Sequence, residues 1–131
     1  MEVSASLFGK IGETTEVHLV ELDNGFLKVK LSTYGACITS IQLPDKNGQL
    51  GEVVLGFDTL EEYLDEHPYF GVTVGPVANR ISGAQFTLND KVYSLPQNDG
   101  LNNLHSGPMG LDKRVWSYNT CLLYTSDAAD D

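Results

Sequence analysis

The sequence predicts a mainly all-β fold of antiparallel strands with one short helix, and three features support this. Short apolar stretches, several of which alternate with polar residues, recur roughly every ten residues over the first two-thirds of the chain, as half-buried strands do. Asn-Gly pairs at 24–25 and 47–48 separate some of these stretches and favour tight turns. A helical pattern occurs in one segment, residues 58–71. Together these features indicate an antiparallel β architecture.

The amino-terminal part is expected to form two hairpins. The first joins residues 17–22 to 26–31 across Asn24-Gly25, and leucine and valine alternate with lysine in its second strand, which is the period of a half-buried strand. The second joins residues 36–43 to 52–57 across Asn47-Gly48. Each turn contains the Asn-Gly pair that hairpins prefer.

The segment DTLEEYLDEHPYFG (58–71) predicts a helix of two turns at most. Asp58 or Thr59 can cap its start, and two glutamates follow in the first turn, where the helix dipole favours negative charge. Leu60 and either Tyr63 or Leu64 share one face. Pro68 ends the pattern.

Beyond the helix, a third hairpin is predicted from residues 84–88 and 91–95 across Asn89-Asp90. Residues 96–116 are irregular and rich in glycine, asparagine and proline. A long polar segment of this kind in a compact β protein is often functional. Regularly spaced apolar residues favour a loop packed on the core, namely Leu101, Leu104, Met109 and Leu111.

Composition excludes several classes of function. The 131 residues form at most one ordinary domain or a piece of a larger one. With 18 acidic and 8 basic residues, the net charge of −10 argues against nucleic acid as a partner. No apolar run is long enough to span a membrane. The amino terminus lacks the apolar segment of a secretory signal, so a cytoplasmic protein is expected.

Cysteine and motif content point away from metal and cofactor chemistry. Cys37 and Cys121 are too few and too far apart for a zinc motif or a disulfide framework. Cys37 lies in the apolar stretch ACITSIQL and is interpreted as a buried, inert thiol. Nucleotide-binding, dinucleotide-binding and zinc-protease motifs are missing from the sequence. No metal site is therefore expected.

The stretch VGPVANRISG (74–83) is the first candidate site, because it brackets a polar Asn79-Arg80 pair with apolar and turn residues. Val74, Val77 and Ile81 are expected in the core. Burying the amide alone without partners would cost roughly 2–7 kcal/mol. Either a carboxylate elsewhere in the chain satisfies the pair, or a ligand does.

Other polar residues join this candidate site in a loose constellation. His105 lies in NNLHSG, and Asp112-Lys113-Arg114 precedes Trp116. An amide, a guanidinium, an imidazole and an indole are what a sugar pocket uses. Each also has a simpler explanation: Arg80 can pair with a carboxylate, His105 can be a satisfied loop histidine, and Trp116 can be core.

Several motifs resemble the amino-terminal part of the galactose mutarotase (aldose 1-epimerase) family over about residues 8–116. They agree in order and spacing: Tyr34-Gly35-Ala36, Val54-Leu55-Gly56-Phe57, Pro68-Tyr69-Phe70-Gly71, Asn79-Arg80-Ile81, Leu104-His105 with Gly107, and Asp112-Lys113 before Trp116. The resemblance implies an antiparallel β-sandwich of the galactose mutarotase type, truncated in this chain. It implies an isomerase that interconverts the α and β anomers of free aldoses such as galactose and glucose, without a cofactor.

The resemblance also implies roles for particular residues. Asn79 and Arg80 match the family's substrate-binding pair, and His105 matches its first binding-pocket histidine. In the family, a glutamate takes the proton of the C1 hydroxyl while a histidine protonates the ring oxygen. Both lie in the part of the family that this chain does not reach, so no catalytic residue is assigned. Pro76 departs from the family pattern, in which an arginine often follows the glycine.

These inferences give a domain plan. Residues 1–120 are expected to be the amino-terminal portion of an aldose 1-epimerase domain, inactive without the remainder. Residues 121–131 (CLLYTSDAADD) resemble translated sequencing-adaptor read-through and are interpreted as an unrelated tail; a natural acidic terminus is the alternative. The alternative functions are a non-catalytic carbohydrate-binding β module and a hexose-6-phosphate 1-epimerase relative. The sequence leaves the preferred aldose and the oligomeric state open.

Overall fold

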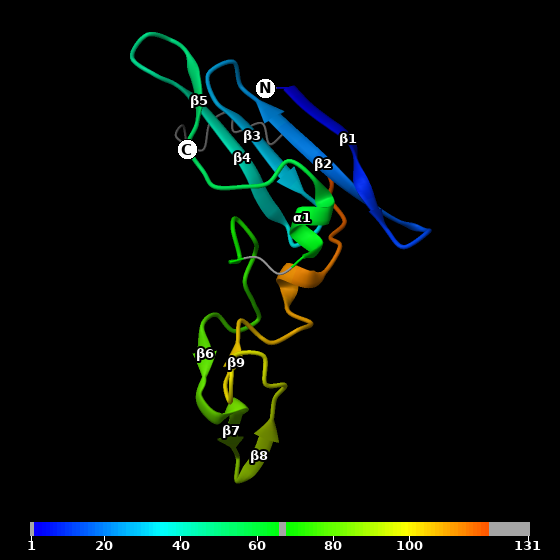
Figure 1. Ribbon diagram of the computed structural model, residues 1–131, viewed down its shortest axis with the longest axis vertical. Coiled ribbons are helices and arrows are strands. Elements are labelled where there is room, and N and C mark those ends of the chain that lie inside the picture. Colours follow the sequence, from blue (N-terminus) through cyan, green and yellow to red (C-terminus); the bar gives the residue numbers. More distant parts are fainter. Residues whose placement is uncertain (1, 66–67, 121–131) are drawn as a thin grey trace, which may run out of the picture.

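A five-stranded antiparallel sheet forms the first half of the computed structural model, which describes residues 2–65 and 68–120 (Figure 1). The strands pair in chain order, so each lies beside its sequence neighbour. They are β1 (Glu2–Ile11), β2 (Thr15–Asp23), β3 (Lys28–Ser32), β4 (Cys37–Pro44) and β5 (Leu50–Glu52). The predicted mainly β, antiparallel fold is confirmed. The predicted tail, residues 121–131, lies outside the described residues.

The first predicted hairpin is confirmed as strands β2 and β3, and a side chain caps its turn. The side-chain oxygen of Asn24 accepts hydrogen bonds from the N–H groups of Phe26 at 3.0 Å and Leu27 at 2.7 Å. Next to the turn, the Lys28 ammonium contacts the Asp23 carboxylate at 2.7 Å. Turn chemistry and strand alternation therefore specify the same register.

Strand β1 was not predicted from the sequence. It pairs with β2 along its whole length, with an irregularity between Leu7 and Gly9. Most of its residues are exposed, so its pairing depends on the backbone of β2 more than on burial of its own side chains. Gly9 lies against helix α1, and a Cβ atom there would lie 2.7 Å from Leu60 Cδ2. The missing side chain lets strand and helix pack closely.

Strand β5 ends earlier than the predicted strand 52–57. The Glu52 carboxylate accepts hydrogen bonds from the N–H groups of Ile41 at 2.8 Å and Val54 at 3.2 Å. It also accepts one from the Ser40 hydroxyl. Because the Glu52 carboxylate takes the Ile41 N–H, only one ladder bond follows in the described chain, from the Val53 N–H to the Ile41 carbonyl at 2.9 Å. Residues 53–57 then form a connection to the helix.

Helix α1 (Leu60–Leu64) confirms the predicted helix. Thr59 is its N-cap, and the Thr59 N–H donates to the Glu62 carboxylate at 3.2 Å. Leu60 and Tyr63 are buried, whereas Leu64 is exposed. Within the described residues, no helix is long and apolar enough to cross a membrane.

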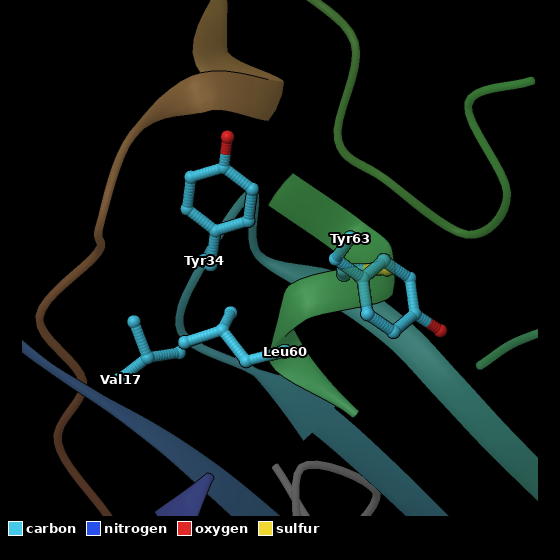
Figure 2. Packing of buried hydrophobic residues seen from close by; sticks show 5 residues of the cluster. Val17, Tyr34, Leu60 and Tyr63 are labelled. Atoms are coloured by element: carbon cyan, nitrogen blue, oxygen red, sulfur yellow. The ribbon is translucent and has the colours of Figure 1, made fainter. Parts of the chain in front are cut away.

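The core lies between α1 and the sheet, and Figure 2 shows its buried side chains. Leu60 and Tyr63 from the helix form one cluster with Val17, Tyr34 and Cys37. Cys37 is fully buried, and burial raises the pKa of its thiol to about 11. The predicted burial of Cys37 is confirmed, and a raised pKa disfavours the reactive thiolate.

The second half of the described chain consists of two small antiparallel ladders beyond the helix (Figure 1). Strand β7 pairs with β8, which confirms the third predicted hairpin. Strand β6 pairs with β9, which was not predicted. The elements are β6 (Arg80–Ile81), a 3₁₀ turn (Ser82–Ala84), β7 (Gln85–Leu88), β8 (Lys91–Ser94), β9 (Asn103–Leu104) and a 3₁₀ turn (Leu111–Lys113).

Three burial expectations for this half are wrong. Val77 is 47% exposed, although it was expected in the core. Leu101 and Met109 are 73% and 70% exposed, although a loop packed on the core was expected. The physical reason is that these residues lie beside two-stranded ladders, and no second layer of the described chain covers them.

The turn at residues 33–36 joins the two halves through its backbone. The Gly35 N–H donates to the Arg114 carbonyl at 2.8 Å, and the Gly35 carbonyl accepts from the Thr73 N–H at 2.9 Å. The Trp116 N–H donates to the Thr33 carbonyl at 2.8 Å. The segments that precede and follow the β6–β9 region are therefore fixed to the same turn.

Replacing Gly35 with alanine is expected to destabilise the fold by about 3 kcal/mol, from a strained backbone angle and a steric clash. Gly35 has φ of +71°, and a Cβ atom there would lie 2.7 Å from the Asp112 carbonyl oxygen. Gly48→Ala is the matched control, because Gly48 has φ of +82° but nothing lies within 4 Å of its added Cβ. Urea unfolding of the 131-residue chain, followed by fluorescence of Trp116, measures the free energy of unfolding of both variants. Equal losses of unfolding free energy would contradict the close-contact argument.

Candidate functional site

The β6–β9 ladder brings together the three residues predicted to bind substrate. Arg80 pairs with Leu104 in the ladder, which places Asn79 beside His105. The His105 N–H donates to the Asn79 carbonyl at 3.0 Å. The Asn79 N–H donates to Nδ1 of the His105 ring at 2.9 Å. Residues 26 positions apart in the chain thus share one edge of a small ladder.

The contact to Nδ1 fixes the hydrogen-bonding role of His105. A backbone N–H can only donate, so Nδ1 must accept. In the neutral imidazole the proton is therefore on Nε2, which becomes a donor. The His105 side chain is half-buried, and so it can offer this donor to a ligand from a fixed orientation.

Arg80 is satisfied by a carboxylate that sequence reasoning did not single out. Its Nε donates to Asp99 Oδ2 at 2.6 Å, and its Nη1 donates to the Asn79 side-chain oxygen at 3.3 Å. The Arg80 side chain is 55% exposed, so the cost of burying an unpartnered polar group does not arise for its guanidinium. The alternative that Arg80 pairs with a carboxylate is confirmed.

The asparagines around Asp99 build the turn rather than extend the site. The Asn98 side chain accepts from the Leu104 N–H at 2.8 Å and donates to the Leu104 carbonyl at 2.9 Å. The buried Asn103 donates to the Pro96 carbonyl at 2.8 Å. Asp99 and Asn102 form a backbone bridge between them. This turn chemistry is the sequence signal that could have located Asp99, as an acidic residue immediately before Gly100.

An aromatic ring does lie beside the predicted site residues, but it is Tyr69. The rings of Tyr69 and His105 meet edge to face, with centroids 4.7 Å apart. Lys113 Nζ lies 6.0 Å from the centroid of the same ring and 3.8 Å from Asp112 Oδ2. The structure therefore connects Asp112 and Lys113 to His105 through Tyr69. Tyr69 belongs to the Pro68-Tyr69-Phe70-Gly71 motif, which was noted in the sequence without a role.

Trp116 lies apart from the residues predicted to bind substrate. Its indole N–H donates to the Leu111 carbonyl at 3.1 Å. It lines a groove of about 690 Å³ together with aliphatic residues of β1, β2 and β3, and none of Asn79, Arg80 and His105 lines this groove. This placement does not support the interpretation that the Trp116 indole belongs to a sugar pocket with Asn79, Arg80 and His105. Within residues 2–65 and 68–120, no group of three or more potential metal ligands is found.

An open cluster of fixed hydrogen-bond donors on an antiparallel β fold is suited to recognising carbohydrate hydroxyls. A comparison with known protein families identifies the class of protein. The profile of the aldose 1-epimerase family matches residues 18–129, and the chain belongs to that family.

Individual relatives agree with this assignment. The chain is 44% identical over 119 residues to galactose mutarotase from Sus scrofa, covering 89% of this chain and 34% of that protein. It is 36% identical over 124 residues to aldose 1-epimerase from Streptococcus thermophilus, covering 93% of this chain and 35% of that protein. The chain thus spans about a third of the length of these relatives.

Solved structures confirm the galactose mutarotase type of fold. Galactose 1-epimerase from Lactobacillus acidophilus NCFM matches with a TM-score of 0.76 and 27% identity, over 92% of this chain and 35% of that one. The GalM/aldose epimerase homologue from C. elegans matches with a TM-score of 0.72 and 38% identity, over 76% of this chain and 31% of that one. The described residues therefore represent part of that fold.

The protonation site of His105 can be checked by nuclear magnetic resonance. In the 131-residue chain above neutral pH, two-bond ¹H–¹⁵N correlations should show His105 with its proton on Nε2, because Nδ1 accepts from Asn79. His18 provides the comparison, since its Nδ1 lies 3.5 Å from a hydroxyl that can either donate or accept. A proton on Nδ1 of His105 would contradict the described contact.

Proposed function

We propose that residues 2–120 form the substrate-binding part of an aldose 1-epimerase that interconverts the α and β anomers of free hexoses such as galactose and glucose. Membership of the aldose 1-epimerase family supports the reaction class. The observation that carries the substrate-binding role is the cluster of Asn79, Arg80 and His105 on the β6–β9 ladder.

In this proposal the three side chains supply donors to sugar oxygens. Asp99 holds Arg80 through Nε and Asn79 accepts one N–H of Nη1, which leaves the remaining outer N–H groups of the guanidinium for hydroxyls. Asn79 uses its side-chain oxygen on Arg80, so its amide N–H groups remain available as donors. His105 adds its Nε2–H. Sugar hydroxyls and the ring oxygen accept hydrogen bonds, so the cluster matches an uncharged sugar.

Anomer interconversion also needs a base for the C1 hydroxyl proton and an acid for the ring oxygen. The proposal assigns neither role to a described residue. His18 contacts Glu16 at 3.6 Å, but both lie on β2, away from the β6–β9 ladder (Figure 1). Asn79, Arg80 and His105 therefore orient the sugar, and the acid–base pair belongs to the rest of the enzyme.

Arg80→Lys is expected to raise KM for galactose about tenfold or more, because an ammonium cannot hold Asp99 and a sugar with the planar fork of a guanidinium. The suitable protein is a complete enzyme in which residues 1–120 replace the corresponding part of galactose mutarotase from Sus scrofa. Polarimetry of α-galactose measures the reaction. Arg114→Lys is the matched control, since the hydrogen bonds described for Arg114 use its backbone. An unchanged KM in the Arg80 variant would remove Arg80 from the substrate site.

The 131-residue chain alone is expected to leave the spontaneous rate of galactose mutarotation unchanged, because it supplies binding groups without an assigned acid and base. The same polarimetric assay, at equal molar concentration of the complete enzyme, provides the comparison. Catalysis by the 131-residue chain would place the acid–base pair within it. Sugar binding without turnover by the complete enzyme would instead favour a non-catalytic carbohydrate-binding module.

A further inference from the structure

We infer that Asp99 is a positioning residue that biases the proposed site toward uncharged sugars and against phosphorylated ones. The inference rests on the proposed role of Arg80 in sugar binding. It adds a residue that sets the preference for uncharged over phosphorylated sugars, acting through Arg80 rather than by touching the reacting atoms.

The first step is the geometry of the ion pair. Asp99 Oδ2 lies 2.6 Å from Arg80 Nε, a short charge-assisted hydrogen bond. Nε is the inner nitrogen of the guanidinium, so the carboxylate occupies one edge of the fork. On the outer edge, one N–H of Nη1 donates to the Asn79 side-chain oxygen, and the other outer N–H groups are not used by Asp99. Asp99 thereby neutralises the charge of Arg80 without covering the N–H groups that a hydroxyl would use.

The second step is that Asp99 is held in place independently of Arg80. The Asn102 N–H donates to the Asp99 carbonyl at 2.9 Å, and the Asp99 N–H donates to the Asn102 carbonyl at 3.2 Å. The neighbouring Asn98 side chain fixes this turn to Leu104 on β9. The carboxylate is therefore presented from a turn that is docked on the same ladder as the site.

The third step is the balance of charge around His105. Arg80 pairs with Asp99, and Lys113 pairs with the buried Asp112 at 3.8 Å. Within the described residues, the cations that border the site residues thus each have a carboxylate partner. A phosphate carries about −1.5 to −2 charges at neutral pH and needs unpaired cations to offset its desolvation. Beside Asp99 it would meet a negative charge instead, whereas a hydroxyl would not be repelled.

Two substitutions test this charge balance with the 131-residue chain and inorganic phosphate as the probe. Asp99→Asn should raise phosphate affinity about tenfold at low ionic strength, and added salt should reduce this gain. Asp90→Asn is the matched control, because Asp90 lies in the β7–β8 turn and its loss changes the net charge equally. Perturbation of the Arg80 Nε–H resonance by phosphate measures binding at the site itself.

A double variant separates positioning from a general structural effect. If Asp99 acts through Arg80, the gain from Asp99→Asn should vanish when Arg80 is also replaced by alanine. Asp99→Glu retains the carboxylate and should keep phosphate affinity near that of the unsubstituted chain. Equal phosphate affinities of the Asp99→Asn and Asp90→Asn chains would overturn the inference, as would a gain that persists without Arg80.

The complete enzyme gives the corresponding measurement on substrates. Asp99→Asn should lower the ratio of kcat/KM for galactose over galactose 6-phosphate about tenfold, chiefly through KM for the phosphorylated sugar. An unchanged ratio would overturn the inference while leaving the proposed function intact. If the complete enzyme turns over neither sugar, the proposed function fails, and the phosphate titration of the 131-residue chain still decides the role of Asp99.

Discussion

The backbone of the turn at residues 33–36 is the constraint on which the rest of the described structure depends. Gly35 uses both its N–H and its carbonyl to hold segments that lie far apart in sequence, Thr73 and Arg114. The positive φ of Gly35 and the close Asp112 carbonyl leave no room for a side chain. The polypeptide between Thr73 and Arg114 is consequently a long loop closed at its base, and this closure limits its conformational freedom.

The closed base of this loop explains how the short β6–β9 ladder can hold the candidate site residues in place. Strands β6 and β9 each contain two residues, which would be marginal in isolation. Ser106 adds a second connection, since its hydroxyl accepts from the Val77 N–H at 2.8 Å and donates to the Val77 carbonyl at 3.0 Å. Between the closed base and this pair of hydrogen bonds, Asn79 and His105 have little freedom to move apart. The candidate site is thus pre-organised by hydrogen bonds rather than by burial.

Elements that are determined by interactions within a few residues could be predicted from the sequence. Elements that depend on contacts with distant parts of the chain could not. Hairpins with Asn24-Gly25 or Asn89-Asp90 turns were predictable because turn chemistry and alternation act over a few residues. Strand β1 was missed because its pairing depends on β2. Asn79, Arg80 and His105 were singled out from the residue pattern, and the family resemblance supplied their expected roles in substrate binding. Asp99 and Tyr69 were not assigned roles, because each contacts the site only after the chain has folded back on itself.

The magnitude of the Arg80–Asp99 interaction argues that its main effect is not on stability. Both side chains are about a third or more exposed, and ion pairs in such positions stabilise a fold by about 0–1 kcal/mol. The turn that carries Asp99 is already fixed by Asn98 and Asn102, so the pair is not needed to close it. What the pair does determine is the orientation of the guanidinium and the net charge around it. A planar guanidinium held by a carboxylate keeps its fork of donors in a fixed direction, and in the proposed function that fork meets the sugar hydroxyls.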